Sequence, residues 1–77
     1  MRHRWIHSEK QRYYSVVLVH DLFDQWTLIQ CWGALGSHLG RLRIVHVASK
    51  QAGLKHIEAI SKRRRQHGYE QQATNRT

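Results

Sequence analysis

The sequence has no proline, a single cysteine and only five acidic residues, against thirteen lysines and arginines. One cysteine excludes an internal disulfide bond and a zinc site built from cysteines within one chain. A reduced, cytoplasmic setting is the simplest expectation. The longest unbroken apolar run covers residues 16–19, which is far too short to span a membrane. No apolar segment follows the basic N-terminus, so we expect no signal peptide and no membrane partner.

The middle of the chain has no positive charge. No lysine or arginine lies between residues 13 and 40, where Asp21 and Asp24 give a formal charge of −2. Since the whole chain carries +8, the flanking segments together carry +10. Such an excess favours a polyanionic partner, although a basic protein without such a partner stays the plainer alternative.

The length sets a second limit. Seventy-seven residues form one domain, which hides only about 60% of the surface of its unfolded chain. A core that small leaves little room for a deep active-site cleft. We find no Ser-His-Asp order, no phosphate-binding glycine loop and no carboxylate pair. We therefore expect a protein that is not an enzyme and uses neither a cofactor nor a small-molecule substrate.

The seven histidines do not form a metal-binding pattern. His3 and His7 have the spacing of one helical turn, but a helix is not expected there. Four later histidines, His38, His46, His56 and His67, lack ligand-type spacing and companion carboxylates, so we expect no metal site. Cys31 lies inside an apolar segment, and a buried, unreactive thiol is the expected state.

Alternating apolar residues predict the strands. Residues 13–20, 26–32 and 41–47 are rich in β-branched and aromatic side chains, and a short first strand at residues 5–6 has weaker support. Both alternating sets of residues 13–20 are mostly apolar, which indicates an interior strand. Residues 21–24 form the connection, with Leu22 and Phe23 expected to fold back into the core. Three glycines within residues 33–40 predict the next turn.

Helical periodicity begins after Ser49, a good N-cap residue. From residue 50 to about 67, Gly53, Leu54, Ile57, Ile60 and Ser61 lie on one side, and Gln51, Lys55, Glu58 and Lys62 lie opposite. Gly68 is placed to end the helix. The predicted fold class is α+β, a small antiparallel sheet with one long C-terminal helix packed across it. Residues 71–77 are polar, and we expect a disordered tail there.

Trp32 and Gly33 stand at the end of an apolar strand and form the most informative pair in the chain. A large aromatic next to a residue without a side chain suits a flat binding surface that another backbone can approach. In a chain of charge +8, that surface is suited to sugars and bases, with cations at the phosphates. A core tryptophan beside glycines that only shape a hairpin is the alternative.

These features, taken in order, resemble the WGR domain family. The matching segments are Arg12-Tyr13-Tyr14, Asp21-Leu22-Phe23 followed by Trp26, Leu28, Trp32-Gly33-Ala34-Leu35-Gly36-Ser37, a basic strand, a Ser-initiated helix, a Lys/Arg run and Gly68-Tyr69. The resemblance covers residues 4–70, and bacterial members with a Leu-Phe-x-x-Trp segment are the most similar. It implies a WGR-like domain over residues 1–70.

The resemblance also implies a function. In poly(ADP-ribose) polymerases the domain helps to recognise DNA breaks, and the motif tryptophan packs on the sugar of a terminal nucleotide. By that resemblance Trp32 is the leading DNA contact, Gly33 permits close approach, and Gln11 and Arg12 match a segment near the DNA backbone. The motif arginine is Ala34 here, so a contact made by that arginine is absent.

Further cations complete the expected DNA surface. Arg41 and Arg43 lie across the hairpin and are possible replacements for the motif arginine. The basic helix end, with Lys62 and Arg63, is a second binding candidate, and its alternative is a solvated helix terminus.

We expect a DNA-binding module with little sequence preference, acting on duplexes, nicks or ends in the bacterial cytoplasm or nucleoid. A protein-interaction module using the Trp32 surface or a sheet edge is the alternative function. The expected DNA-binding residues are Gln11, Arg12, Trp32, Gly33, Arg41, Arg43, Lys62 and Arg63.

Overall fold

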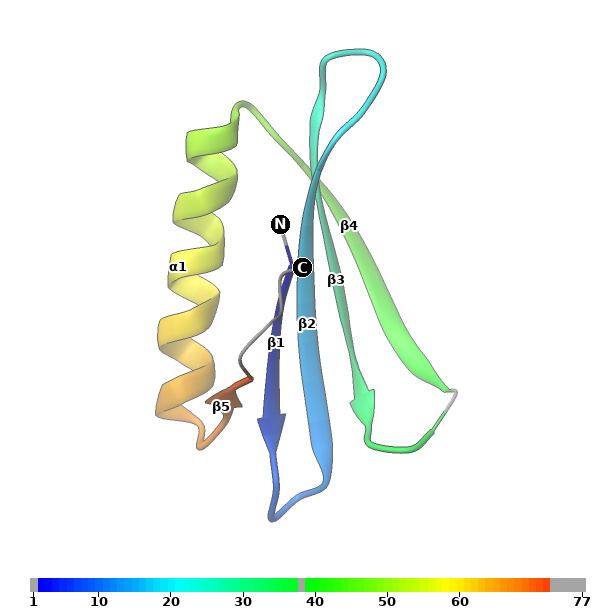
Figure 1. The fold of residues 1–77 in the computed structure, drawn as a ribbon, viewed down its shortest axis with the longest axis vertical. Helices are drawn as coiled ribbons and strands as arrows, with labels where there is room; N and C mark the ends of the chain where they lie inside the picture. Colours follow the sequence, from blue (N-terminus) through cyan, green and yellow to red (C-terminus); the bar gives the residue numbers. More distant parts are fainter. Residues whose placement is uncertain (1, 38, 73–77) are drawn as a thin grey trace.

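The computed structural model describes residues 2–37 and 39–72. Within them a five-stranded antiparallel sheet carries one helix across one face (Figure 1). Its strands stand side by side in the order β4-β3-β2-β1-β5, so the three chain-consecutive hairpins are neighbours. The elements are β1 (Arg2–His7), β2 (Arg12–His20), β3 (Trp26–Ala34), β4 (Gly40–Val47), α1 (Lys50–Gln66) and β5 (Glu70–Gln71).

The two faces of the sheet follow from strand alternation. The face toward α1 carries the even-numbered side chains of β2 and β3 and the odd-numbered ones of β1 and β4, as the register requires. The buried core lies between this face and the helix. It consists of Trp5, Val16, Leu18, Leu28 and Ile57.

The helix begins and ends where the sequence predicts. The Ser49 hydroxyl accepts a hydrogen bond from the Ala52 amide at 3.1 Å, which caps the first turn. Gly68 follows the last turn with φ +88°, a left-handed conformation that favours glycine. Gly53 and Ile57 are buried against the sheet. A Cβ at Gly53 would stand 2.6 Å from Leu18 Cδ1, so glycine sets how closely the helix approaches the sheet.

The chain enters and leaves the fold through paired strands. The first strand runs from residue 2, well beyond the two residues expected, because it pairs with β2 along its whole length. At the other end, Gln71 pairs with Trp5, and the Gln72 amide donates a hydrogen bond to the Arg4 carbonyl at 2.8 Å. The tail expected from residue 71 therefore begins with two residues attached to β1. Residues 73–77 of that tail lie outside the described residues.

The prediction that Leu22 and Phe23 fold back into the core is wrong. Both side chains lie at the tip of the β2–β3 hairpin, where Leu22 is 100% exposed and Phe23 is 83% exposed. The hairpin extends beyond the first turn of α1, so its tip has no core beneath it (Figure 1).

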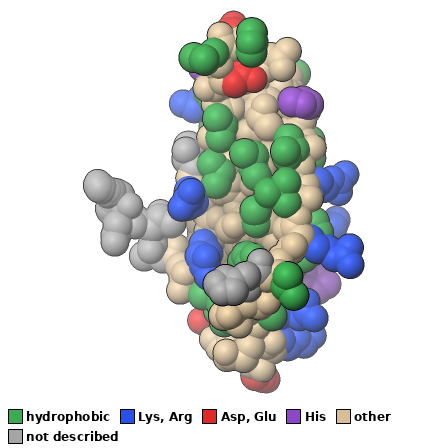
Figure 2. Space-filling view, turned by 90° about the vertical axis from the view of Figure 1, so that its right-hand side faces the viewer, with side chains coloured by type: hydrophobic (Ala, Val, Ile, Leu, Met, Phe, Trp, Pro, Cys, Tyr) green, Lys and Arg blue, Asp and Glu red, His purple; other side chains and the backbone are tan. Residues whose placement is uncertain are grey.

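The sheet face away from α1, here called the open face, is not covered by a helix of the described residues. Hydrophobic side chains gather along its middle, and Lys and Arg side chains stand at its sides (Figure 2). Leu42 and Ile44 are more than half exposed on β4. Cys31 also lies on this face and is only half-buried, so the buried thiol expected from the sequence is not observed. The neighbouring strands lie in the same sheet layer as Cys31 and therefore cannot cover its side chain from above.

We expect acidification to loosen β5 through His3. Burial lowers the pKa of His3 below its ordinary value of 6.5. Its Nδ1 lies 2.9 Å from the Gln71 amide nitrogen, which can only donate, so the folded state holds His3 neutral. The unfolded chain then binds more protons below pH 6.5, and stability falls as pH drops through that value. An NMR titration measures this: a His3 midpoint at or above 6.5 contradicts the prediction.

Candidate nucleic-acid interface

Trp32 lies near the C-terminal end of β3, on the face of the sheet that carries α1. It is half-buried and does not belong to the core cluster. Its ring stacks on that of Tyr14 in the neighbouring strand, with centroids 5.7 Å apart and planes inclined by 13°. Arg41 is its partner in β4. The indole is therefore covered by Tyr14 on one side and stands beside a cation on the other.

Gly33 has a packing reason to lack a side chain. A Cβ there would stand 3.2 Å from Gly40 Cα and 3.4 Å from the Tyr13 ring. A Cβ at Gly40 would meet the Tyr13 hydroxyl at 2.7 Å. The two paired glycines make room for Tyr13 on the open face, which accounts for Gly33 without any ligand.

A cavity of about 240 Å³ opens between α1 and the sheet, close to the Tyr14 ring. Arg43 reaches it from β4, and Arg63 and Arg64 reach it from the last turns of α1. We call these three arginines the cation cluster. None of the described residues that line the cavity is acidic. Its lining consists of Tyr14, Gln30, Arg43, Val45, His56, Ala59, Ile60, Arg63 and Arg64.

Tyr14 connects the tryptophan to the cation cluster. Its hydroxyl donates a hydrogen bond to Gln30 Oε1 at 3.0 Å, and Gln30 is itself buried. The Arg64 guanidinium lies over the Tyr14 ring, 4.6 Å from its centroid. Burial raises the pKa of Tyr14, and the charges of the cation cluster oppose that rise. One aromatic ring thus contacts Trp32 on β3 and a helix arginine.

The family-model comparison decides the family. The model described as WGR domain matches residues 1–76, nearly the entire chain. The chain belongs to the WGR domain family. This confirms the resemblance, and WGR domains are binding modules of the nucleic-acid type, not catalytic domains. No curated protein and no solved structure shows significant similarity to the chain.

This WGR domain brings only some of the expected residues together. Arg41 stands beside Trp32, while Arg43 and Arg63 share the cavity. Lys62 lies on the exposed, outward side of α1, apart from the cation cluster. The remaining two lie at the β1–β2 turn: Arg12 pairs with Ala34, and the Gln11 carbonyl accepts a hydrogen bond from the Leu35 amide at 2.8 Å.

Sequence reasoning missed Tyr14 and Gln30 as members of this site, and it left Arg64 of the basic helix end out of the expected DNA contacts. Arg64 was visible in the helical periodicity, because it follows Ile57 by seven residues and Ile60 by four, on the inward stripe. Tyr14 and Gln30 are recognisable only from the strand register, which the sequence does not reveal.

Two negative findings apply to the described part of the WGR domain. Among residues 2–37 and 39–72, no three or more His, Cys, Asp or Glu side chains gather as metal ligands would. Within the same residues, no helix combines the length and the hydropathy that a membrane-spanning segment needs.

Proposed function

We propose that this WGR domain binds DNA with little sequence preference. The observation that carries the proposal is the convergence of arginines from β4 and α1 beside the Trp32–Tyr14 stack. Arginines suit phosphates because their fork of N–H donors matches phosphate oxygens. The half-buried indole offers an apolar surface for a sugar or an exposed base at a nick or end.

On this proposal the cations provide most of the affinity and Trp32 provides the preference for DNA ends or nicks. The arginines that carry the proposal lie beside the inner stripe of α1, which packs on the sheet, so the proposed contact is with the DNA backbone and needs no helix inserted into a groove. Gln11 and Arg12 lie near the same end of the sheet and extend the contact with the backbone. We place the domain, acting without catalysis and without a cofactor, with the nucleoid in the bacterial cytoplasm.

A titration of labelled DNA tests the proposal. Duplex, nicked and single-stranded DNA are each titrated by fluorescence anisotropy at several salt concentrations. If Arg41, Arg43, Arg63 and Arg64 each neutralise one phosphate, log K falls against log[salt] with a slope of about −3.6 on duplex DNA. Negligible binding to all three DNA forms at low salt contradicts the proposal.

Trp32→Ala tests the role of the indole. Stacking on a base contributes about 1–3 kcal/mol, so we expect at least about fivefold weaker binding to nicked DNA and an unchanged salt slope. Trp26→Ala is the matched control, because Trp26 is the other half-buried tryptophan of β3 and lies at its far end. Both variants are first compared by circular dichroism. Equal losses of affinity in the two folded variants refute a specific role for Trp32.

A second candidate function is protein binding at the β4 edge. β4 ends the sheet, so the outer side of its backbone has no strand partner among the described residues. The exposed Leu42 and Ile44 favour this candidate. If this candidate is right, Trp32→Ala leaves the affinity for DNA unchanged. It weakens the capture of a protein partner only if the Trp32 surface is part of the protein interface.

A further inference from the structure

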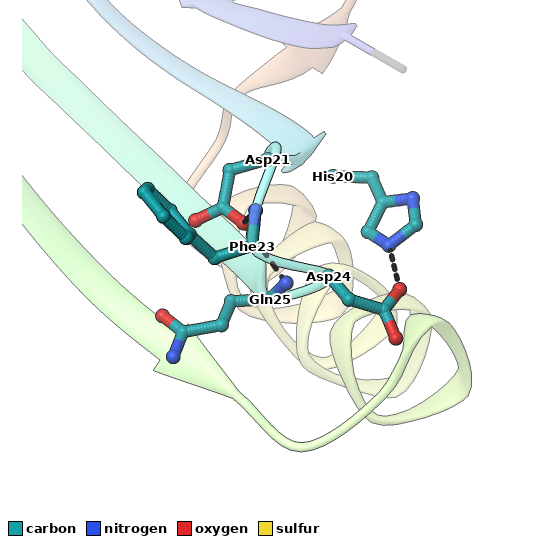
Figure 3. A network of polar contacts seen from close by, with 5 residues as sticks. All are labelled: His20, Asp21, Phe23, Asp24 and Gln25. Carbon is teal, nitrogen blue, oxygen red and sulfur yellow. Dashed lines mark hydrogen bonds and ion pairs between the residues drawn. The ribbon is translucent and has the colours of Figure 1, made fainter.

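The tip of the β2–β3 hairpin, residues 21–25, is an ordered turn and not a loose loop (Figure 3). Asp21 Oδ1 accepts hydrogen bonds from the Phe23 and Gln25 amides, both at 2.9 Å. The Asp21 amide donates to the Gln25 carbonyl at 2.9 Å. Asp24 has φ +63°, a left-handed conformation that aspartate tolerates better than most residues.

The tip is also attached to the core. Asp24 Oδ1 lies 2.6 Å from His20 Nε2 (Figure 3). The His20 ring stacks on Trp26 with centroids 4.2 Å apart and planes inclined by 5°. Trp26 in turn packs against the buried core. Leu22 and Phe23 are therefore held in a fixed position at almost full exposure, which lowers the entropy lost when they bind.

The charge of the tip is opposite to that of the rest of the protein. Asp21 and Asp24 give the tip a formal charge of −2, and no lysine or arginine lies within residues 13–40. DNA phosphates would repel such a surface. Two exposed apolar side chains flanked by carboxylates fit a partner with an apolar hollow and a cationic rim.

The open face offers a hollow of that kind. A shallow groove of about 610 Å³ crosses it, within the size range of ligand-binding pockets. Val17, Ile29 and Cys31 form its apolar floor, and Arg2 and Arg4 stand on its β1 side. The Arg4 guanidinium lies over the Tyr13 ring, 5.1 Å from its centroid. None of the described residues that line the groove is acidic, and no described acidic residue pairs with either arginine.

We propose that the hairpin tip of one molecule docks in the open-face groove of a second copy. Phe23 and Leu22 would cover the apolar floor while Asp21 and Asp24 face Arg2 and Arg4. The tip stands at one end of the molecule (Figure 1), whereas the groove is lined by residues farther along the same strands and by Gly36 and Ser37 after the other end of β3, so the contact forms between molecules. A symmetric dimer through the open face would instead bring the arginines of two grooves together.

The proposed contact joins two different surfaces, so each copy has one free tip and one free groove. Repetition of such a contact gives rings or open chains instead of closed dimers. The inference goes beyond DNA binding and does not depend on it. Molecules linked in this way would also bind neighbouring DNA sites cooperatively.

Sedimentation velocity of the full chain without DNA tests the proposal. The wild-type protein should sediment faster as its concentration rises. The tip variant Leu22→Ser/Phe23→Ser and the groove variant Arg2→Glu/Arg4→Glu should each stay monomeric to at least tenfold higher concentration. Lys55→Glu/Lys62→Glu is the matched control, because it makes the same charge change as the groove variant on the outward side of α1, away from both the tip and the groove. That variant should associate like the wild type.

The decisive sample is a mixture of the two defective variants. The tip variant keeps its groove and the groove variant keeps its tip, so the mixture should form a one-to-one dimer that does not grow further. A wild type that is monomeric throughout overturns the proposal. So does a wild type that associates while the mixture stays monomeric, since that result indicates a symmetric contact. The tip substitutions alter only exposed side chains, so loss of fold cannot imitate their effect.

Discussion

We expect Trp5→Ala to remove most of the folding stability of this domain. Trp5 is the largest fully buried side chain, and it contacts both the Tyr14 and His3 rings. Truncating a core tryptophan raises the free energy of the folded state by about 3–5 kcal/mol. At about 0.05–0.15 kcal/mol per residue, a chain of this length has roughly 4–12 kcal/mol in total. Urea denaturation followed by circular dichroism measures the loss.

Trp5→Phe is the control for this prediction. The indole nitrogen of Trp5 is buried and has no hydrogen-bond partner among the described residues. Phenylalanine removes that unsatisfied donor and keeps most of the buried ring, so we expect a clearly smaller loss than for alanine. If the urea denaturation midpoint of Trp5→Ala is close to that of the wild type, the assignment of Trp5 to the centre of the core is wrong.

We expect Arg43→Gln/Arg63→Gln to weaken DNA binding about 60-fold at 0.1 M salt. Each neutralised phosphate contributes about 0.9 to the magnitude of the slope of log K against log[salt]. Two lost contacts therefore lower that magnitude by about 1.8, which at 0.1 M salt corresponds to a loss of affinity of about 1.8 decades. Both side chains reach the cavity from different elements, and neither belongs to the buried core. Anisotropy titrations over a range of salt concentrations measure the slope and the affinity together.

Lys55→Gln/Lys62→Gln is the matched control, with the same change in net charge. Both lysines lie on the exposed, outward side of α1. We expect a much smaller loss of affinity, because long-range attraction alone is reduced and salt screens it. If the lysine pair weakens binding as much as the arginine pair, net charge and not the cation cluster determines the affinity.

Most of the fold was predictable because its elements are locally consistent. Alternating apolar residues located β2, β3 and β4, and the Ser49 cap with the stripe through Ile57 located α1. The short strands were the weak point. β1 and β5 have few apolar residues of their own, and both form because their backbones pair with neighbours far away in the sequence.

The hairpin tip shows the limit of reading hydrophobicity alone. Leu22 and Phe23 are apolar, which favours burial, but the Asp21 and Asp24 hydrogen bonds hold the turn beyond the end of the helix. Whether an apolar residue is buried depends on whether another element stands opposite it. That is a property of the assembled sheet and helix.

The family, the fold class and the net positive charge follow from the amino-acid sequence alone, because they depend on composition and on patterns between near neighbours. Which cations lie close together depends on how the helix packs on the sheet. Arg43 and Arg64 are twenty-one residues apart in the sequence and meet at one cavity because α1 crosses the sheet above Tyr14. The same packing half-buries Trp32, and no helix of residues 2–37 and 39–72 covers the opposite face, since one helix can cover only one side.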